Sequence, residues 1–237
     1  MDFPDVPTIQ LPQSIWFTEQ HNLDRFAALV ARHRNLVLLL RDEDSYTTAR
    51  RSLTADARLC PDLAFGLGPI PRTSSPTQDI VWLRRSDRES SDTSSGSRTI
   101  DGVSPVDWAM ASPREAMRGR RGALLLRLNG VLTRGTQRSP SLWRLLAATY
   151  EPLALARLAY GCEMLGKGRV VVTDRLHGVV LSLLLGIPVV AVDNINHKVM
   201  SFVSTWLTEL PGLRVAADHE SGLQLARLQL AEAAERT

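Results

Sequence analysis

The stretch RVVVTDRLHGVVLSLLLGIPVVAVDNINHKVMSFVSTW, residues 169–206, decides the fold. It contains an apolar strand over residues 169–174, a polar turn TDRLHG, an apolar helix, and a second apolar strand over residues 187–193. This order predicts a β-α-β unit, in which the two strands are parallel and the crossover between them is right-handed. The stretch therefore predicts an α/β fold built around a parallel sheet.

The flanking sequence extends this unit in both directions. Its other predicted elements are strands at 80–85, 106–110 and 213–217 and helices at 141–165, 198–207 and 221–235. The long helix at 141–165 is amphipathic, with apolar positions at Leu145, Leu146, Leu153, Leu155, Leu158 and Ala159. Residues 86–99 are rich in serine and indicate a mobile loop, and residues 111–132 are ambiguous. Residues 78–237 are thus predicted to form a Rossmann-like domain.

The first part of the chain repeats the alternation of strands and helices. We predict strands at 6–12 and 35–42, a short strand or strand end at 59–65, and helices at 22–33 and up to residue 53. Asp44 or Ser45 can cap the second helix, and the apolar run before it is typical of a strand buried on both faces of a parallel sheet. A Pro/Ser/Thr-rich connector at 69–78 suggests a domain boundary. Residues 1–77 therefore form a partial N-terminal domain in this prediction, because they supply only about three strands.

Composition narrows the class of protein. The chain has 237 residues, of which 44% are hydrophobic and 22% charged, as in ordinary globular proteins. A net charge of +3 suits small anions or a membrane surface and is too weak to indicate nucleic acid. Cys60 and Cys162 lack metal-ligand spacing. Met1 is followed by DFPDVP, without the basic and apolar segments of a signal peptide, so we expect a cytoplasmic protein.

The TDRLHG turn carries the strongest chemical signal. It follows a strand end and precedes a helix, where unpaired N–H groups favour anions. Arg175 adds a planar fork of donors suited to phosphate or carboxylate, and His177 can transfer a proton near neutral pH. Gly178 permits close approach of a ligand or a neighbouring backbone. The alternative interpretation is a structural ion pair between Asp174 and Arg175, with His177 as a capped or buried imidazole.

These residues lie in a recognisable pattern. The segment VVVTDRLHGVVLSLLLGIPVVAVDN (170–194) closely resembles the signature of the polysaccharide pyruvyl transferase family, in its bacterial exopolysaccharide branch. FPDVPTIQLPQSIWF, LLLRDEDS, LCPDLAF and VWLRRSDRE are similar to further segments of that family. Family members usually carry a Gly/Asn/Asp-rich loop upstream of the segment where this chain starts. The resemblance therefore implies an incomplete N-terminal unit, through a late gene start or a real loss.

The resemblance implies a GT-B-like pair of Rossmann-like units with the active site in the cleft between them. The reaction it implies transfers pyruvate from phosphoenolpyruvate, as a ketal, to a sugar of an exopolysaccharide or its lipid-linked precursor. Arg175 and His177 match the family's phosphoenolpyruvate-binding arginine and catalytic histidine, and Arg41 matches a second basic contact. The resemblance implies neither a metal nor an organic cofactor. A lipid-linked acceptor would bring the protein to the inner face of the membrane as a peripheral component.

Other polar side chains near strand ends are further candidates for substrate binding. They are Gln13, Ser14, Arg84, Arg85, Asn194, His197 and Lys198. For each of them the alternative is a structural or solvated role, and for residues 194–198 that role is a helix cap with exposed charge. Asp62 is expected to organise its own turn.

Two other functions remain open from the sequence. A GT-B-type glycosyltransferase that uses a nucleotide sugar would share the fold, although the chain lacks an evident nucleotide-binding Glu or Gly-rich phosphate loop. An inactive, truncated homologue would bind a saccharide or a partner without turnover. Binding of phosphoenolpyruvate or of a nucleotide sugar distinguishes these functions.

Overall fold

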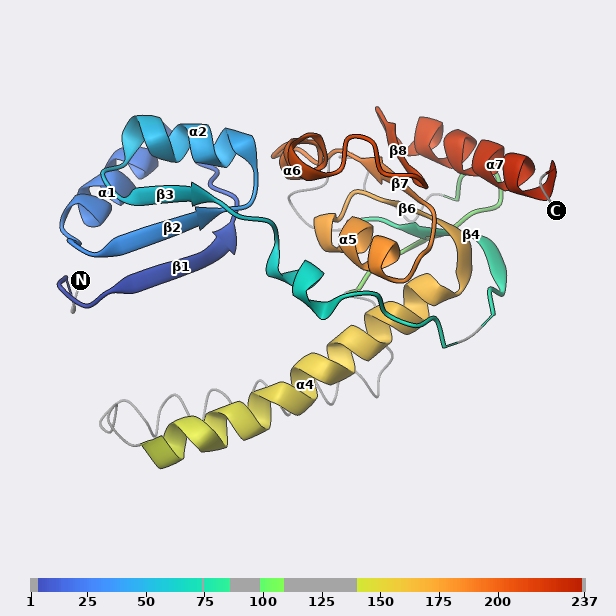
Figure 1. Cartoon of the computed structure of the whole chain (residues 1–237). Helices are drawn as coiled ribbons and strands as arrows, with labels where there is room; N and C mark the ends of the chain where they lie inside the picture. The colour runs from blue at the N-terminus through green and yellow to red at the C-terminus, as the bar shows by residue number, and fades with distance from the viewer. Residues whose placement is uncertain (1–3, 74, 86–98, 109–139, 236–237) are drawn as a thin grey trace.

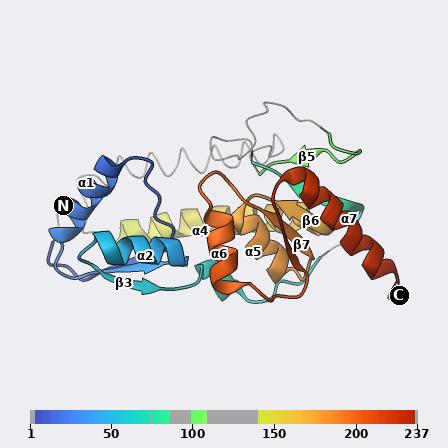
Figure 2. The ribbon, with the colours of Figure 1, turned by 90° about the horizontal axis from the view of Figure 1, so that it is seen from above.

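The chain forms an α/β fold with two parallel sheets, shown in Figure 1. The structure, a computed structural model, describes residues 4–73, 75–85, 99–108 and 140–235. The strand order is β1-β2-β3 in one sheet and β5-β4-β6-β7-β8 in the other. The N-terminus lies beside the smaller sheet and the C-terminus at the far end of the larger one (Figures 1 and 2). The predicted α/β class with parallel strands is confirmed, whereas the domain boundary, the GT-B-like pairing and the incomplete first unit stay predictions.

The smaller sheet contains the first three strands. Its strands are β1 (Thr8–Gln13), β2 (Leu36–Leu40) and β3 (Asp56–Leu59), and its helices are α1 (Gln20–Ala31) and α2 (Glu43–Ser52). Both strand pairs are parallel, as the sequence predicts. Leu38 and Leu40 are buried together with Ala49 of α2, whereas Val37 and Leu39 are only half-buried. The expectation that this strand is buried on both faces is therefore wrong for three of its five residues, Leu36, Val37 and Leu39.

Asp42 begins α2, in place of the predicted Asp44 or Ser45. Its backbone is extended, with φ −148° and ψ 154°, and its side chain accepts a hydrogen bond from the Ser45 amide at 2.8 Å. An extended residue whose carboxylate reaches the third amide of the helix is the favoured N-cap geometry. In the segment 59–65, the predicted strand end is found at Leu59, the last residue of β3, and a short 3-10 helix, η1 (Leu63–Leu67), follows in place of a further strand.

The larger sheet is covered on both faces. Its strands are β4 (Gln78–Leu83), β5 (Pro105–Val106), β6 (Gly168–Thr173), β7 (Val189–Val192) and β8 (Leu213–Ala216). Its helices are α4 (Pro140–Gly166), α5 (Leu176–Leu184), α6 (Lys198–Trp206) and α7 (His219–Glu235). Val81 and Val171 face a core formed with α5, α6 and the end of α4, while Trp82 and Val172 face α7. Alternate side chains of a strand point to opposite faces of the sheet. Because helices cover both faces, the strands of the larger sheet can be apolar at consecutive positions.

The long helix α4 confirms the helix predicted at 141–165 but not the whole of its apolar face. Leu155 is 58% exposed, whereas Leu158 and Leu165 pack into the core near the end of the helix. Figure 1 shows the other end of α4 extending away from the larger sheet. The predicted mobile loop at 86–99, apart from its last residue, and the ambiguous segment at 111–132 lie outside the described residues. Among the helices of the described part, none is long and apolar enough to cross a membrane.

Gly178 lets α5 lie close to the sheet, and we expect Gly178→Val to lower the free energy of unfolding. A Cβ atom there would lie 2.7 Å from Thr173 Oγ1 and 2.9 Å from Leu83 Cδ2. Both neighbours are buried and short, so the helix would have to shift, at a cost of about 1–3 kcal/mol. The matched control is Gly66→Val, because a Cβ at Gly66 has no atom within 4 Å. Equal unfolding midpoints in urea for the two variants would contradict this account.

Candidate active site

Arg175 lies at the junction between β6 and α5. It is the N-cap of α5, with an extended backbone, and its NH2 group donates to Asp107 Oδ1 at 2.5 Å. The Arg175 side chain is 17% exposed and that of Asp107 is 3% exposed, so this is a largely buried ion pair. Asp107 directly follows β5. The pair therefore fixes the guanidinium across the carboxyl ends of two strands.

Asp174, the other member of the predicted ion pair, has different partners. It is fully buried, with Oδ1 accepting a hydrogen bond from the Arg85 amide at 2.9 Å and Oδ2 lying 3.5 Å from His219 Nε2. His219 Nδ1 accepts a hydrogen bond from Trp82 Nε1 at 3.1 Å. Because an indole nitrogen only donates, Nδ1 carries no proton, and the His219 proton is on Nε2, facing Asp174. Asp174 thus ties together the ends of β4 and β6 and the start of α7.

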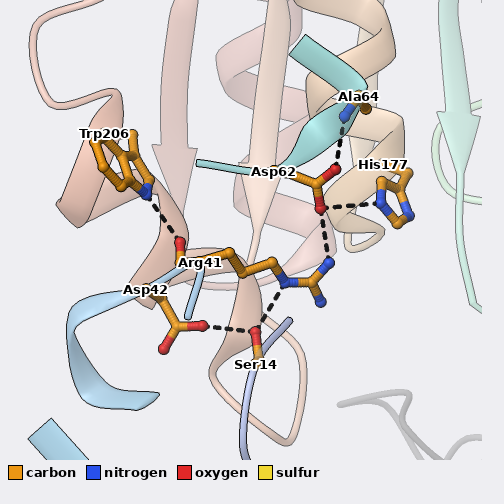
Figure 3. Close-up of polar contacts among 7 residues, drawn as sticks. All are labelled: Ser14, Arg41, Asp42, Asp62, Ala64, His177 and Trp206. Atoms are coloured by element: carbon orange, nitrogen blue, oxygen red, sulfur yellow. Dashed lines mark hydrogen bonds and ion pairs between the residues drawn. The ribbon is translucent and has the colours of Figure 1, made fainter. Parts of the chain in front are cut away.

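His177 lies in the first turn of α5, and its side chain is 63% exposed. This exposure contradicts the alternative interpretation in which His177 is a buried imidazole. Its Nε2 lies 3.2 Å from Asp62 Oδ2, which belongs to the residue that caps η1. The same carboxylate oxygen accepts a hydrogen bond from Arg41 NH1 at 2.8 Å (Figure 3). One carboxylate oxygen therefore joins a histidine of the larger sheet to an arginine of the smaller one.

Asp62 is ionised in this arrangement. Burial by itself raises the pKa of the carboxyl group, but hydrogen bonds from His177, the Ala64 amide and Arg41 outweigh it. The pKa of Asp62 is consequently held well below its usual range. The Asp62 side chain is 8% exposed, so the negative charge lies almost entirely inside the protein. A buried carboxylate of this kind needs its cationic neighbours.

Further hydrogen bonds hold Arg41 in place from the other side. Its Nε donates to Ser14 Oγ at 3.0 Å, and Ser14 Oγ donates to Asp42 Oδ2 at 2.6 Å. From α6, Trp206 Nε1 donates to the Arg41 carbonyl at 2.8 Å and Ser201 Oγ to Asp42 Oδ1 at 3.3 Å (Figure 3 shows the first). Figure 2 shows α6 beside α2, consistent with these contacts. The end of β2 is therefore attached directly to α6, a helix that packs on the larger sheet.

The structure brings only some of the predicted site residues together. Arg41, Ser14 and His177 belong to one network through Asp62, and Arg175 stands one residue before the turn of helix that carries His177. Arg84 is buried, with its guanidinium carbon 5.8 Å from the centre of the Trp82 ring on the α7 side of the sheet. It is therefore not at the network.

The side chains of the other predicted residues do not join this network in the described contacts. Asn194 is buried, and its Oδ1 accepts a hydrogen bond from the Lys198 amide at 3.1 Å, which is the helix-cap role left open by the sequence. Asn194 and His197 line a cavity of about 620 Å³ beyond β7 and β8. His197 Nδ1 lies 2.6 Å from Asp193 Oδ2. Gln13 is exposed at the end of β1, where its carbonyl accepts a hydrogen bond from the Arg41 amide at 3.3 Å.

Sequence reasoning missed the bridging role of Asp62. The expected turn role is correct, since Asp62 Oδ1 accepts a hydrogen bond from the Ala64 amide at 3.0 Å. The position of Asp62 in the sequence could have indicated its contact with Arg41. Both residues follow parallel strands, whose carboxyl ends share one edge of a sheet. In the described part of the chain, no group of three or more His, Cys, Asp or Glu side chains is placed to hold a metal ion.

The fold and the site together define an α/β protein that gathers arginine and histidine side chains at the carboxyl ends of parallel strands. The sequence model described as "Polysaccharide pyruvyl transferase" matches residues 2–197, and the chain belongs to that family. The resemblance inferred from the TDRLHG turn is thereby confirmed. A solved structure, that of the uncharacterized protein KP1_0663 from Klebsiella pneumoniae, shares the fold. It has a TM-score of 0.52 and 16% identity, over 90% of this chain and 64% of that one.

Two curated relatives carry pyruvyl transferase names. "Pyruvyl transferase 1" of Schizosaccharomyces pombe is 32% identical over 235 residues, which cover 92% of this chain and 51% of that protein. "Putative pyruvyl transferase EpsO" of Bacillus subtilis is 28% identical over 217 residues, which cover 90% of this chain and 63% of that protein. The chain therefore spans between about half and two thirds of the length of these relatives.

Proposed function

We propose that this chain transfers pyruvate from phosphoenolpyruvate, as a ketal, to a sugar of an exopolysaccharide or its lipid-linked precursor. The observation that carries this proposal is the convergence of Arg41 and His177 on one carboxylate oxygen, that of Asp62. Arg41 and His177 therefore lie side by side, with Arg175 one residue before the helix turn that carries His177. A guanidinium group is suited to bind a carboxylate or a phosphate. Phosphoenolpyruvate carries both groups next to the carbon that must be protonated.

Each side chain has a distinct role in this proposal. Arg175 and Arg41 bind the phosphate and carboxylate of phosphoenolpyruvate, and the N-terminus of α5 adds its partial positive charge. His177, exposed at that helix end, supplies a proton as general acid to the methylene carbon of the enol. The enol carbon then accepts the sugar hydroxyl groups and phosphate leaves. This chemistry requires neither a metal nor an organic cofactor, and a lipid-linked acceptor would place the reaction at a membrane surface in the cytoplasm.

Ligand-dependent stabilisation tests the donor assignment. Phosphoenolpyruvate at about 100 times its dissociation constant should stabilise the native protein by about 2.7 kcal/mol, because it binds the folded state alone. The melting temperature should therefore rise with phosphoenolpyruvate and stay constant with UDP-glucose. Stabilisation by UDP-glucose alone would favour a glycosyltransferase, and stabilisation by neither would favour a homologue without this activity.

Arg175 variants test the site within the same measurement. We expect Arg175→Lys to weaken phosphoenolpyruvate binding about 10-fold or more, because an ammonium replaces a planar fork. Lysine keeps a positive charge beside Asp107, which is buried, so this variant should fold; Arg175→Ala should bind more weakly still. The control is Arg58→Lys, since Arg58 is 64% exposed and pairs with Asp56. Wild-type affinity in Arg175→Lys and Arg175→Ala would show that the donor does not contact Arg175.

A further inference from the structure

Asp62 does more than close its own turn. One carboxylate oxygen, Oδ1, caps η1 through the Ala64 amide, which satisfies the local requirement. The other oxygen, Oδ2, is directed to Arg41 at 2.8 Å and to His177 at 3.2 Å (Figure 3). Capping alone requires neither contact. The carboxylate is therefore placed to act on both side chains.

The contact defines which nitrogen of His177 faces the protein. A carboxylate held in its ionised form only accepts hydrogen bonds, so Nε2 of His177 must carry the proton that faces Oδ2. The Asp62 side chain is 8% exposed and that of His177 is 63% exposed. The ring therefore has one edge anchored on a buried group while most of its surface is open to solvent. Nδ1 is the ring nitrogen left for a ligand.

We propose that Asp62 is a positioning residue that holds His177 through Nε2, so that Nδ1 is the atom that exchanges protons with the substrate. The inference rests on the function proposed above for the identity of the substrate. A carboxylate behind a histidine fixes the tautomer and the orientation of the ring and stabilises the imidazolium. Asp62 adds a link across the two sheets, because the oxygen that orients His177 also binds Arg41.

The proton inventory of the reaction is consistent with this assignment. Nδ1–H of the imidazolium gives its proton to the methylene carbon of phosphoenolpyruvate, and a C–H bond forms as the enol π bond breaks. The first sugar hydroxyl adds to the neighbouring carbon, and its proton returns to Nδ1. The C–O bond to phosphate then breaks as the second hydroxyl forms the ketal, and that hydroxyl's proton leaves with the phosphate. The histidine ends in its starting form, with Nε2–H on Asp62 throughout.

Nuclear magnetic resonance tests the contact without any substrate. With ¹⁵N-labelled histidine at low temperature, we expect an exchange-protected, downfield Nε2–H proton that disappears in His177→Gln. In Asp62→Asn, which keeps an oxygen for the Ala64 amide, this signal should be lost or shifted to faster exchange. The control is Asp56→Asn, because Asp56 is 51% exposed and pairs with Arg58. A signal unchanged in Asp62→Asn, or a proton found only on Nδ1 in the wild type, would overturn the proposal.

A double-mutant comparison tests whether Asp62 acts through His177. We expect Asp62→Asn to lower kcat about 10- to 100-fold, a larger factor than the accompanying rise in the dissociation constant of phosphoenolpyruvate, which reports any loosening of Arg41. In the double variant, Asp62→Asn should lower kcat no further than His177→Gln alone, since the effects of substitutions at residues that act as a unit are not additive. Losses that multiply, or an unchanged kcat with tighter binding of phosphoenolpyruvate, would refute the positioning role. The resonance experiment needs neither phosphoenolpyruvate nor an acceptor sugar. It therefore tests the contact between Asp62 and His177 even if the proposed function is wrong.

Discussion

Replacing His177 with glutamine is expected to lower the rate of phosphate release from phosphoenolpyruvate by about 10²- to 10⁴-fold, the usual contribution of a general acid. Glutamine can still donate a hydrogen bond to Asp62 but cannot supply a proton to carbon. Binding of phosphoenolpyruvate should change less than about threefold, because the proposed anion contacts come from Arg175 and Arg41. The assay would use methyl hexopyranosides with neighbouring or 4,6-hydroxyl pairs as acceptors and would measure released phosphate.

Because His177 is exposed, the test separates an effect on catalysis from an effect on folding. Its side chain is 63% exposed, so the substitution should leave the free energy of unfolding within about 0.5 kcal/mol of the wild type. His21→Gln is the matched control, since His21 is equally exposed and pairs only with nearby Glu19 among the described ion pairs. Turnover retained within threefold in His177→Gln would exclude His177 as the acid. A proportional loss of donor binding and turnover would instead assign it to binding.

The succession β6, α5, β7 along the chain could be predicted because both strands are short apolar runs bounded by polar turns. The strands RVVVT and VVAV are covered by helices on both faces. Their sequences therefore contain continuous apolar runs and do not alternate between apolar and polar residues, which makes them easy to recognise as buried strands. The exposed middle of α4 shows where this reasoning fails. Leu155 fits the apolar pattern of a covered helix, but what covers a helix face depends on tertiary packing, which periodicity does not specify.

The candidate site was predictable in its residue types but not in its pairings. Arg175 and His177 stand out because a strand end, a polar turn and a helix start coincide there. Their acidic partners lie 68 and 115 residues away in sequence, respectively, and only the packing of β5 and η1 brings them close. Asp62 also has a local role as a cap, which gave the sequence a sufficient explanation for an acidic residue at that position. When a residue has both a local and a distant contact, the sequence indicates only the local one.

Phe202→Ala is expected to lower the free energy of unfolding by about 3–5 kcal/mol, the usual cost of truncating a fully buried aromatic side chain. Phe202 is 0% exposed in α6 and lies against Phe65 of η1, with ring centroids 6.1 Å apart and ring planes within 6°. Urea unfolding followed by circular dichroism measures the change. Phe202→Leu is the matched control, since it keeps most of the apolar volume and should cost less than about 1.5 kcal/mol. Similar losses in both variants would point to backbone disruption of α6 in place of a cavity.

The position of Phe202 connects this stability effect to the site. Its neighbour Ser201 contacts Asp42, and its ring partner Phe65 follows the Asp62 cap by three residues. A cavity at Phe202 would therefore loosen η1 and α6, the two segments that set the distance between Arg41 and His177. Because the leucine variant remains folded, its affinity for phosphoenolpyruvate separates the two effects. We expect that affinity to fall about 3- to 10-fold if packing at η1 sets the geometry of the anion contacts, given the sensitivity of such contacts to small displacements. Wild-type affinity in Phe202→Leu would show that the hydrogen bonds of Asp62 maintain the geometry without this support.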